Sequence, residues 1–205
     1  MNATATFAVT AGLIAVMLSA GARAESPVAL TVRLYNTAGI PDAAMVAARR
    51  AAESILRDIW PDVAFRYCGS RVSAKRPIDP CDDSLKPSEV VVRVINAPAF
   101  NTTLQPDAFG VTYVVKETNR GWLATVFPDR IDQAASRVGM DRGRLLGLVM
   151  AHEVGHLLLG TGYHSATGLM VADWPDALLA RKGDAWRFSA FEAAAMRQVL
   201  ASIAG

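Results

Sequence analysis

The segment Arg142–Leu159 constrains the fold more than any other part of the chain, because its apolar side chains cover nearly every side of the helix that it predicts. A helix of this kind lies in the centre of a domain, so the remaining elements must pack around it. Asp141 is a suitable N-cap, and Gly160 is a suitable residue to end the helix. All three histidines of the chain lie within or just after this segment, at positions 152, 156 and 164.

His152 and His156 are four residues apart, and this spacing places both imidazoles on one face of the helix. Two imidazole nitrogens can then bind one zinc ion, whose acidity activates a water molecule. Glu153 stands next to the first histidine, where its carboxylate can take the proton of that water. The alternative is a pair of ordinary core histidines, but two imidazoles and a carboxylate inside an apolar helix need a strong compensating interaction. We therefore expect one catalytic Zn²⁺ ion, with Glu153 as the general base.

A catalytic zinc site takes three protein ligands, and His164 is a candidate for the third. Gly160 allows the chain to turn back, because glycine adopts left-handed backbone angles cheaply. His164 can then approach the ion from the side opposite the helix. Met170, a few residues further on, can lie beneath the histidines as an apolar floor.

The run HEVGHLLLGTGYH followed by SATGLM resembles the zinc helix and Met-turn of the metzincin metallopeptidases, and His164-Ser165 resembles the matrixin branch. The order of expected elements over 28–203 is also similar to a metzincin catalytic domain. The resemblance implies a zinc site formed by His152, His156 and His164. It also implies that Glu153 is the general base, that Met170 is the Met-turn residue, and that the strand over 109–115 is the edge to which a peptide substrate adds.

The position of the third ligand departs from the metzincin pattern. In that pattern a glycine follows the second histidine by three residues and the third histidine follows by three more, whereas both intervals here are four, giving Gly160 and His164. The helix must run slightly longer and the turn must be slightly wider. Glu192 is the competing third ligand, since the gluzincin metallopeptidases take a glutamate from a later helix. Ser189 and Glu192 are equally explained as a helix capping box, so both assignments stay open.

The rest of the pattern predicts an α+β fold with a mixed, mostly parallel twisted sheet and an antiparallel edge strand. Alternating and β-branched runs predict strands over 28–35, 62–67, 89–95, 109–115 and 121–127. Helices are expected over 41–60, over 129–138 and from Ser189 to about Ile203. With the central zinc-binding helix and a small helical C-terminal subdomain, this order predicts a zincin-like domain.

Residues 1–24 have the pattern of a secretory signal peptide, with an apolar run over 7–18 and a cleavage signal at Ala22-Arg23-Ala24. The run is shorter than the roughly 20 apolar residues that span a membrane, so we expect cleavage after Ala24 and no stable membrane insertion. Residues 25–205 are then a single secreted or periplasmic domain without a long inhibitory propeptide. In that compartment Cys68 and Cys81 most simply form a disulfide, and the alternative is a thiol that caps the metal.

Charge and composition narrow the choice of partners. The formal net charge is +2 and the basic residues are scattered, which excludes the electrostatic footprint of a nucleic-acid-binding protein. We expect a monomer that acts on a peptide or protein substrate. The leading hypothesis is a secreted zinc endopeptidase. The alternative is an exported, non-catalytic zinc-binding module whose structural site is closed by a fourth protein ligand.

Three further residues near the histidines have possible roles. Tyr163 is a candidate hydrogen-bond donor to the transition state, and Trp174 can either line a substrate pocket or serve packing. Gly155 is unfavourable inside a helix by about 1 kcal/mol relative to alanine, and we expect close packing against a strand to explain it.

Overall fold

The computed structural model describes residues 29–69, 80–98, 107–181 and 186–204, so the expected signal peptide over 1–24 lies outside the described residues. The strands are β1 (Leu30–Asn36), β2 (Val63–Cys68), β3 (Glu89–Val94), β4 (Gly110–Val115) and β5 (Arg120–Val126). The helices are α1 (Asp42–Arg57), α2 (Pro128–Val138), α3 (Arg142–Leu159), α4 (Asp176–Leu179) and α5 (Ala190–Ala204). The sequence predicts each of them to within three residues at either end, except α4, which lies in a stretch expected to be irregular.

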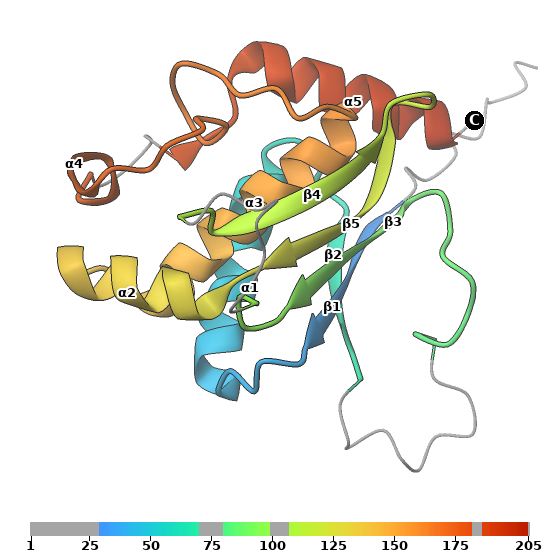
Figure 1. The fold of residues 1–205 in the computed structure, drawn as a ribbon. Helices are drawn as coiled ribbons and strands as arrows, with labels where there is room; N and C mark the ends of the chain where they lie inside the picture. The colour runs from blue at the N-terminus through green and yellow to red at the C-terminus, as the bar shows by residue number, and fades with distance from the viewer. Residues whose placement is uncertain (1–28, 70–79, 99–106, 182–185, 205) are drawn as a thin grey trace, which may run out of the picture.

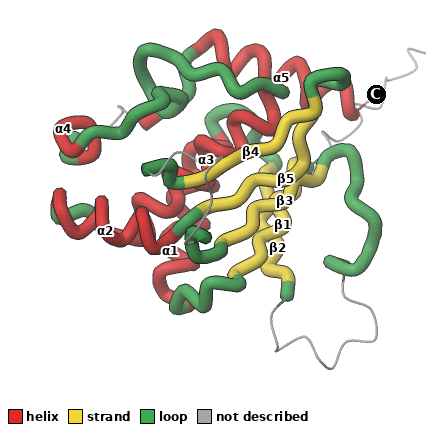
Figure 2. The backbone as a smooth tube through the Cα atoms, in the orientation of Figure 1, coloured by secondary structure: helices red, strands yellow, loops and turns green. Residues whose placement is uncertain are grey.

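The sheet is mixed and mostly parallel, as predicted, with the strand order β2-β1-β3-β5-β4. β1 runs parallel to β2 and β3, and β3 runs parallel to β5. β4 is antiparallel to β5 and lies at the edge of the sheet, where the described residues offer it no second strand partner (Figure 2). Such an edge presents backbone N–H and C=O groups to an extended peptide.

α3 is the centre of the molecule. It lies behind the sheet together with α1 (Figure 1), and it contacts β3, β4 and β5 as well as α1, α2 and α5. Every residue of α3 is buried apart from Arg142, Arg144 and Leu159. Asp141 caps its first turn by accepting a hydrogen bond from the backbone N–H of Arg144. In the described part of the chain, no helix combines the length and apolar character needed to cross a membrane.

α1 packs on α3 through small side chains. A Cβ atom added at Gly143 would lie 2.7 Å from the Cβ of Ala47, and one added at Gly147 would overlap the carbonyl oxygen of Ala48. The two glycines and the alanine-rich face of α1 therefore let the two helix backbones approach closely. This contact sets the position of α3 and of every functional side chain on it.

The opposite face of the sheet holds a buried ion pair that the sequence analysis did not predict. Arg33 and Glu89 are joined at 2.5 Å, and Arg33 also donates hydrogen bonds to the backbone carbonyl oxygens of Cys81 and Asp83. Cys68 and Cys81 form the predicted disulfide, so neither thiol caps a metal. The described part of this loop is therefore tied to β1, β2 and β3.

Replacing Gly147 with alanine tests the contact between α1 and α3. Overpacking costs about 1–3 kcal/mol, and overlap with a backbone carbonyl belongs in the upper part of that range, whereas alanine is the better helix former by about 1 kcal/mol. We therefore expect Gly147→Ala to lower the free energy of unfolding, measured by chemical denaturation, by at least about 1 kcal/mol.

Gly162→Ala is the matched control, because a Cβ atom added at Gly162 meets nothing within 4 Å. Its free energy of unfolding should stay within about 0.5 kcal/mol of the original value. Equal stability of the two variants would contradict the close helix contact.

Candidate metal centre

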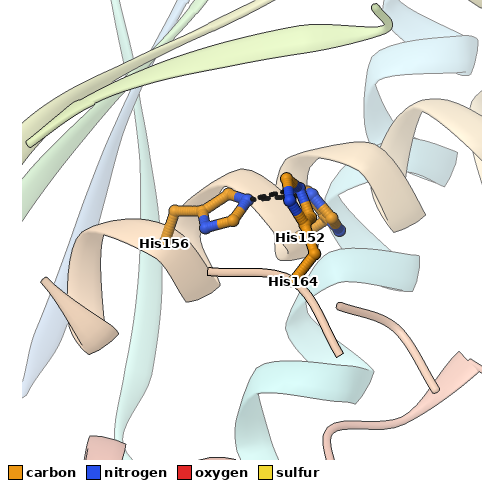
Figure 3. Close-up of side chains that lie close together, drawn as sticks. All are labelled: His152, His156 and His164. Carbon is orange, nitrogen blue, oxygen red and sulfur yellow. Dashed lines mark hydrogen bonds between the residues drawn. The ribbon is translucent and has the colours of Figure 1, made fainter. Parts of the chain in front are cut away.

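The three histidines of the chain meet beside the C-terminal half of α3 (Figure 3). His152 and His156 project from one face of the helix, and His164 reaches them from the loop that follows it. The Nε2 atom of His156 lies 3.1 Å from Nε2 of His152 and 3.2 Å from Nε2 of His164. His152 and His156 are buried, and His164 is exposed. The structure thus brings together the three histidines that the sequence analysis selected.

The outer nitrogens of the two buried rings determine where their protons are. Nδ1 of His152 lies 2.8 Å from the carbonyl oxygen of Leu169, and Nδ1 of His156 lies 2.9 Å from that of Thr161. A carbonyl oxygen only accepts, so each Nδ1 donates, and a neutral ring then has no proton at Nε2. Two such Nε2 atoms at 3.1 Å cannot donate to each other. Their lone pairs point to one place, where a cation would satisfy both.

Burial keeps these rings neutral. It lowers the pKa of His152 from 6.5 to about 3 and the pKa of His156 from 6.5 to about 4, and neighbouring imidazoles add to the effect. Burial also lowers the pKa of His164, against the attraction of the nearby Asp173 carboxylate. Neutral imidazole is the form that binds a metal ion.

The donor set fits zinc. Two nitrogens that each lie about 2.0–2.1 Å from one tetrahedral zinc ion are about 3.3–3.4 Å apart. The separations of 3.1 and 3.2 Å between the imidazoles are close to that value. No further His, Cys, Asp or Glu of the described ranges joins the group, and three protein ligands are typical of catalytic zinc sites. The expected zinc cofactor is supported by this arrangement.

Glu192, the alternative third ligand, lies outside this group. Its Oε2 accepts a hydrogen bond of 2.7 Å from the backbone N–H of Ser189, and the hydroxyl of Ser189 accepts one of 3.2 Å from the backbone N–H of Glu192. These two bonds are the capping box that the sequence predicted at the start of α5. His164, and not Glu192, therefore completes the group on α3.

The loop after α3 accommodates the longer spacing to His164. Gly160 ends the helix with a left-handed φ of 63°, where a Cβ atom would overlap the carbonyl oxygen of Asn119 in the β4–β5 turn. Further along, the backbone N–H of Ser165 donates to the carbonyl oxygen of Met170 at 2.8 Å. The helix extends through Leu159, and the wider turn still returns His164 to it.

The turn over 168–170 lies beneath the histidines. Met170 is fully buried, and a Cβ atom added at Gly155 would lie 2.7 Å from its Sδ and 2.6 Å from Cε1 of Phe188. The expectation that Gly155 packs against a strand is therefore wrong. Gly155 follows His152 by three residues, and its side of α3 faces Met170 and Phe188, which lie outside the strands.

Glu153 lies on the side of α3 that faces β4. Its Oε2 is 2.6 Å from the hydroxyl of Thr112, and a Cβ atom added at Gly110 would lie 2.6 Å from its Oε1. Burial raises the pKa of Glu153 to about 7, and the hydrogen bond with Thr112 acts in the opposite direction. A carboxyl group with a pKa near neutrality is well suited to accept and release a proton. Thr112 and Gly110 are not predicted as functional residues, since nothing in the strand pattern distinguishes them.

These side chains line a cleft with a volume of about 910 Å³. β4 contributes one wall and residues 172–176 contribute another, while α2 contributes Arg130, Gln133 and Arg137. Trp174 lines the cleft and also packs, with its ring edge-on to His152 at 5.6 Å and against Trp186 at 4.7 Å.

Tyr163, by contrast, is 61% exposed, and the cleft is formed without it. The structure therefore gives no support to Tyr163 as a hydrogen-bond donor in the reaction.

Comparison with solved structures identifies the fold. The chain is similar to a zinc-dependent peptidase from Methanocorpusculum labreanum, with a TM-score of 0.52 and 16% sequence identity over 80% of this chain and 99% of that chain. It is also similar to archaemetzincin from Methanopyrus kandleri, with a TM-score of 0.55 and 16% identity over 84% of this chain and 96% of that chain. No protein-family model and no curated protein sequence matches the chain. The fold is thus that of zinc peptidases, in agreement with the predicted zincin-like architecture.

The lowered imidazole pKa values predict how the stability of the metal-free protein depends on pH. Between the ordinary pKa of 6.5 and the folded values of about 3 and 4, the unfolded chain binds protons that the folded chain does not. The free energy of unfolding should therefore fall as the pH is lowered from 6.5 to about 5. The contribution of Glu153 to this pH dependence has the opposite sign, because its pKa is raised from 4.5 to about 7. The contributions of the two imidazoles together outweigh that of this single group.

Denaturant unfolding of the metal-free protein at several pH values measures this dependence. The double variant His152→Asn, His156→Asn is the control. Its free energy of unfolding should fall much less than that of wild type when the pH is lowered from 6.5 to about 5. A wild-type stability that rises on acidification over the same range would show that the rings are not held neutral.

Proposed function

We propose that this protein is a secreted zinc-dependent endopeptidase of the metzincin type, similar to the matrixins, with zinc held by His152, His156 and His164. One observation carries the proposal. The Nε2 atoms of three histidines converge in a cleft that also contains the buried Glu153 carboxylate and is bounded by β4, which has no second strand partner among the described residues. The names of the solved structures with this fold, a zinc-dependent peptidase and an archaemetzincin, point to the same chemistry.

β4 is the proposed docking site for the substrate. An extended peptide can add to the outer edge of this strand, and the backbone hydrogen bonds of such a pairing do not depend on the substrate's sequence. The cleft follows β4 and the residues that flank it, from Phe109 to Lys116, and passes over Glu153 and the histidines. A peptide bound along this strand therefore passes the proposed reaction centre, as internal cleavage of a chain requires.

Each functional side chain has a defined task in the proposed hydrolysis. When bound, zinc supplies Lewis acidity, which polarises the carbonyl group of the scissile bond and makes water more acidic. Glu153 accepts the proton of the attacking water and can pass it to the departing amine. The carbonyl oxygens of Leu169 and Thr161 orient the rings of His152 and His156.

The proposal includes export and action as a monomer. Residues 1–24 are the proposed signal peptide, which would leave Glu25 as the first residue of a single domain over 25–205. The disulfide between Cys68 and Cys81 supports an oxidising compartment, either the periplasm or the cell exterior. All three metal ligands and Glu153 come from one chain, so a second copy is not needed to complete the centre.

The alternative of an exported zinc module without turnover has less support. A structural zinc site is closed by four protein ligands, whereas the described residues supply three. A structural site also has no use for a buried carboxylate beside its ligands.

Hydrolysis of fluorogenic peptides tests the proposed reaction. Glu153→Gln should lower kcat by about 100- to 10,000-fold, because the amide cannot accept the proton, while the zinc content stays that of wild type. Glu117→Gln, which changes an exposed glutamate in the β4–β5 turn, is the matched control and should leave kcat unchanged. Removal of zinc with a chelator should abolish hydrolysis, and added zinc should restore it. Turnover that survives both Glu153→Gln and chelation would rule out this mechanism.

Zinc affinity distinguishes the two candidates for the third ligand. Loss of an outer partner of a metal ligand lowers metal affinity by about 10- to 100-fold. His164→Ala removes a ligand itself, so it should lower zinc affinity by more than about 100-fold. Glu192→Gln should bind zinc as wild type does, because the amide oxygen can still accept the N–H of Ser189 in the capping box. Competition titration with a chromophoric chelator measures both affinities. The opposite ranking of the two variants would assign the third position to Glu192.

A further inference from the structure

We propose that Thr112 is a positioning residue that holds the Glu153 carboxylate in place for proton transfer. This inference rests on the proposed peptidase function. The hydroxyl of Thr112 lies 2.6 Å from Oε2 of Glu153, and among the described residues it is the hydrogen-bonding partner of that carboxylate. The same hydroxyl lies 3.2 Å from the backbone carbonyl oxygen of Glu153. One side chain of β4 therefore contacts both the backbone and the functional group of the proposed base.

The surroundings of Glu153 explain why this contact is needed. Gly110 precedes Thr112 by two residues on β4, so both point to the same face of the sheet, towards α3. Gly110 has no side chain, and the space that a Cβ atom would fill there is taken by the Glu153 carboxylate. The glutamate side chain has several rotatable bonds and can take many orientations. Gly110 leaves space for the carboxylate but has no side chain that could form a hydrogen bond with it. The hydroxyl of Thr112 supplies the directional contact that selects one orientation.

A hydroxyl suits this task because it can donate to a carboxyl oxygen in both protonation states of Glu153. With the carboxylate ionised, the hydroxyl donates its proton to Oε2. When Glu153 takes a proton from water on its other oxygen, Oε1, its Oε2 still accepts the hydrogen bond of the Thr112 hydroxyl. The contact between Thr112 and Glu153 is thus kept before and after proton transfer, and the carboxyl group need not move.

The strand that forms this contact is also the proposed docking edge for the substrate. Thr112 therefore links the location of the peptide backbone to the location of the general base. A loss of peptide docking and a loss of carboxylate positioning have different kinetic signatures, because the first raises KM and the second lowers kcat.

Two substitutions of Thr112 separate its hydroxyl from its shape. Thr112→Val keeps the shape and removes the hydroxyl, and Thr112→Ser keeps the hydroxyl and removes the methyl group. Thr118→Val, in the exposed β4–β5 turn, is the matched control for a threonine-to-valine change. Kinetics with a fluorogenic peptide, metal analysis, and crystal structures of zinc-loaded wild type and Thr112→Val are the measurements.

Thr112→Val should lower kcat by about 10- to 100-fold, the effect of one hydrogen bond to a charged group, and should change KM by less than about threefold. Its zinc content should equal that of wild type, and the carboxylate should leave its wild-type position in the crystal. Thr112→Ser should retain most of the wild-type kcat, and Thr118→Val should retain all of it.

The inference is overturned if Thr112→Val keeps the wild-type kcat, if its loss lies in KM alone, or if Thr112→Ser loses as much as Thr112→Val. The crystal structures separate this inference from the proposed function. If wild-type protein hydrolyses no peptide, the proposed function fails, yet a displaced carboxylate in Thr112→Val still supports the positioning role. A carboxylate that stays in place in that variant overturns the positioning role whatever the activity.

Discussion

Two imidazoles and a carboxylate lie in the buried part of α3, which is otherwise apolar, and the need to satisfy their polar atoms organises the structure around this helix. Loops that follow the helix supply carbonyl oxygens at Leu169 and Thr161 for the outer ring nitrogens, and the sheet supplies the hydroxyl of Thr112 for Glu153. An unpaired polar group at such depth costs several kcal/mol, so these partners are required by stability as well as by chemistry. What remains unsatisfied is the set of inner imidazole nitrogens, which is the part of the site left for a cation.

Some neighbours of α3 only support the helix, and others contact the side chains that would take part in the reaction. On one side α1 places alanines opposite Gly143 and Gly147, so that these glycines can approach its backbone, and the proposed chemistry uses no residue of α1. The side that faces β4 holds Glu153, and a third face holds the histidines above the buried Met170. A rigid contact on the first side keeps the groups on the other two in register with elements that are distant in the sequence.

The sequence predicted the central helix, the mixed sheet and the meeting of the three histidines, because each follows from a short-range pattern. Spacing along the helix joins His152 to His156, and a glycine that ends the helix brings back His164. Contacts between distant segments were beyond such patterns. The ion pair between Arg33 and Glu89 and the contact of Gly155 with Phe188 depend on which face of an element turns towards which neighbour. The contact of Glu153 with Gly110 and Thr112 also depends on which faces of α3 and β4 turn towards each other.

The segment from His156 to His164 has one consequence for how a zinc-binding sequence of this kind is recognised. Each of its two intervals is a residue longer than in the metzincin pattern, yet the third nitrogen arrives 3.2 Å from its neighbour. The left-handed turn and the longer helix absorb the added length. A sequence motif with fixed spacing would therefore not match this chain, whereas a search for three imidazole nitrogens that converge in space would find it.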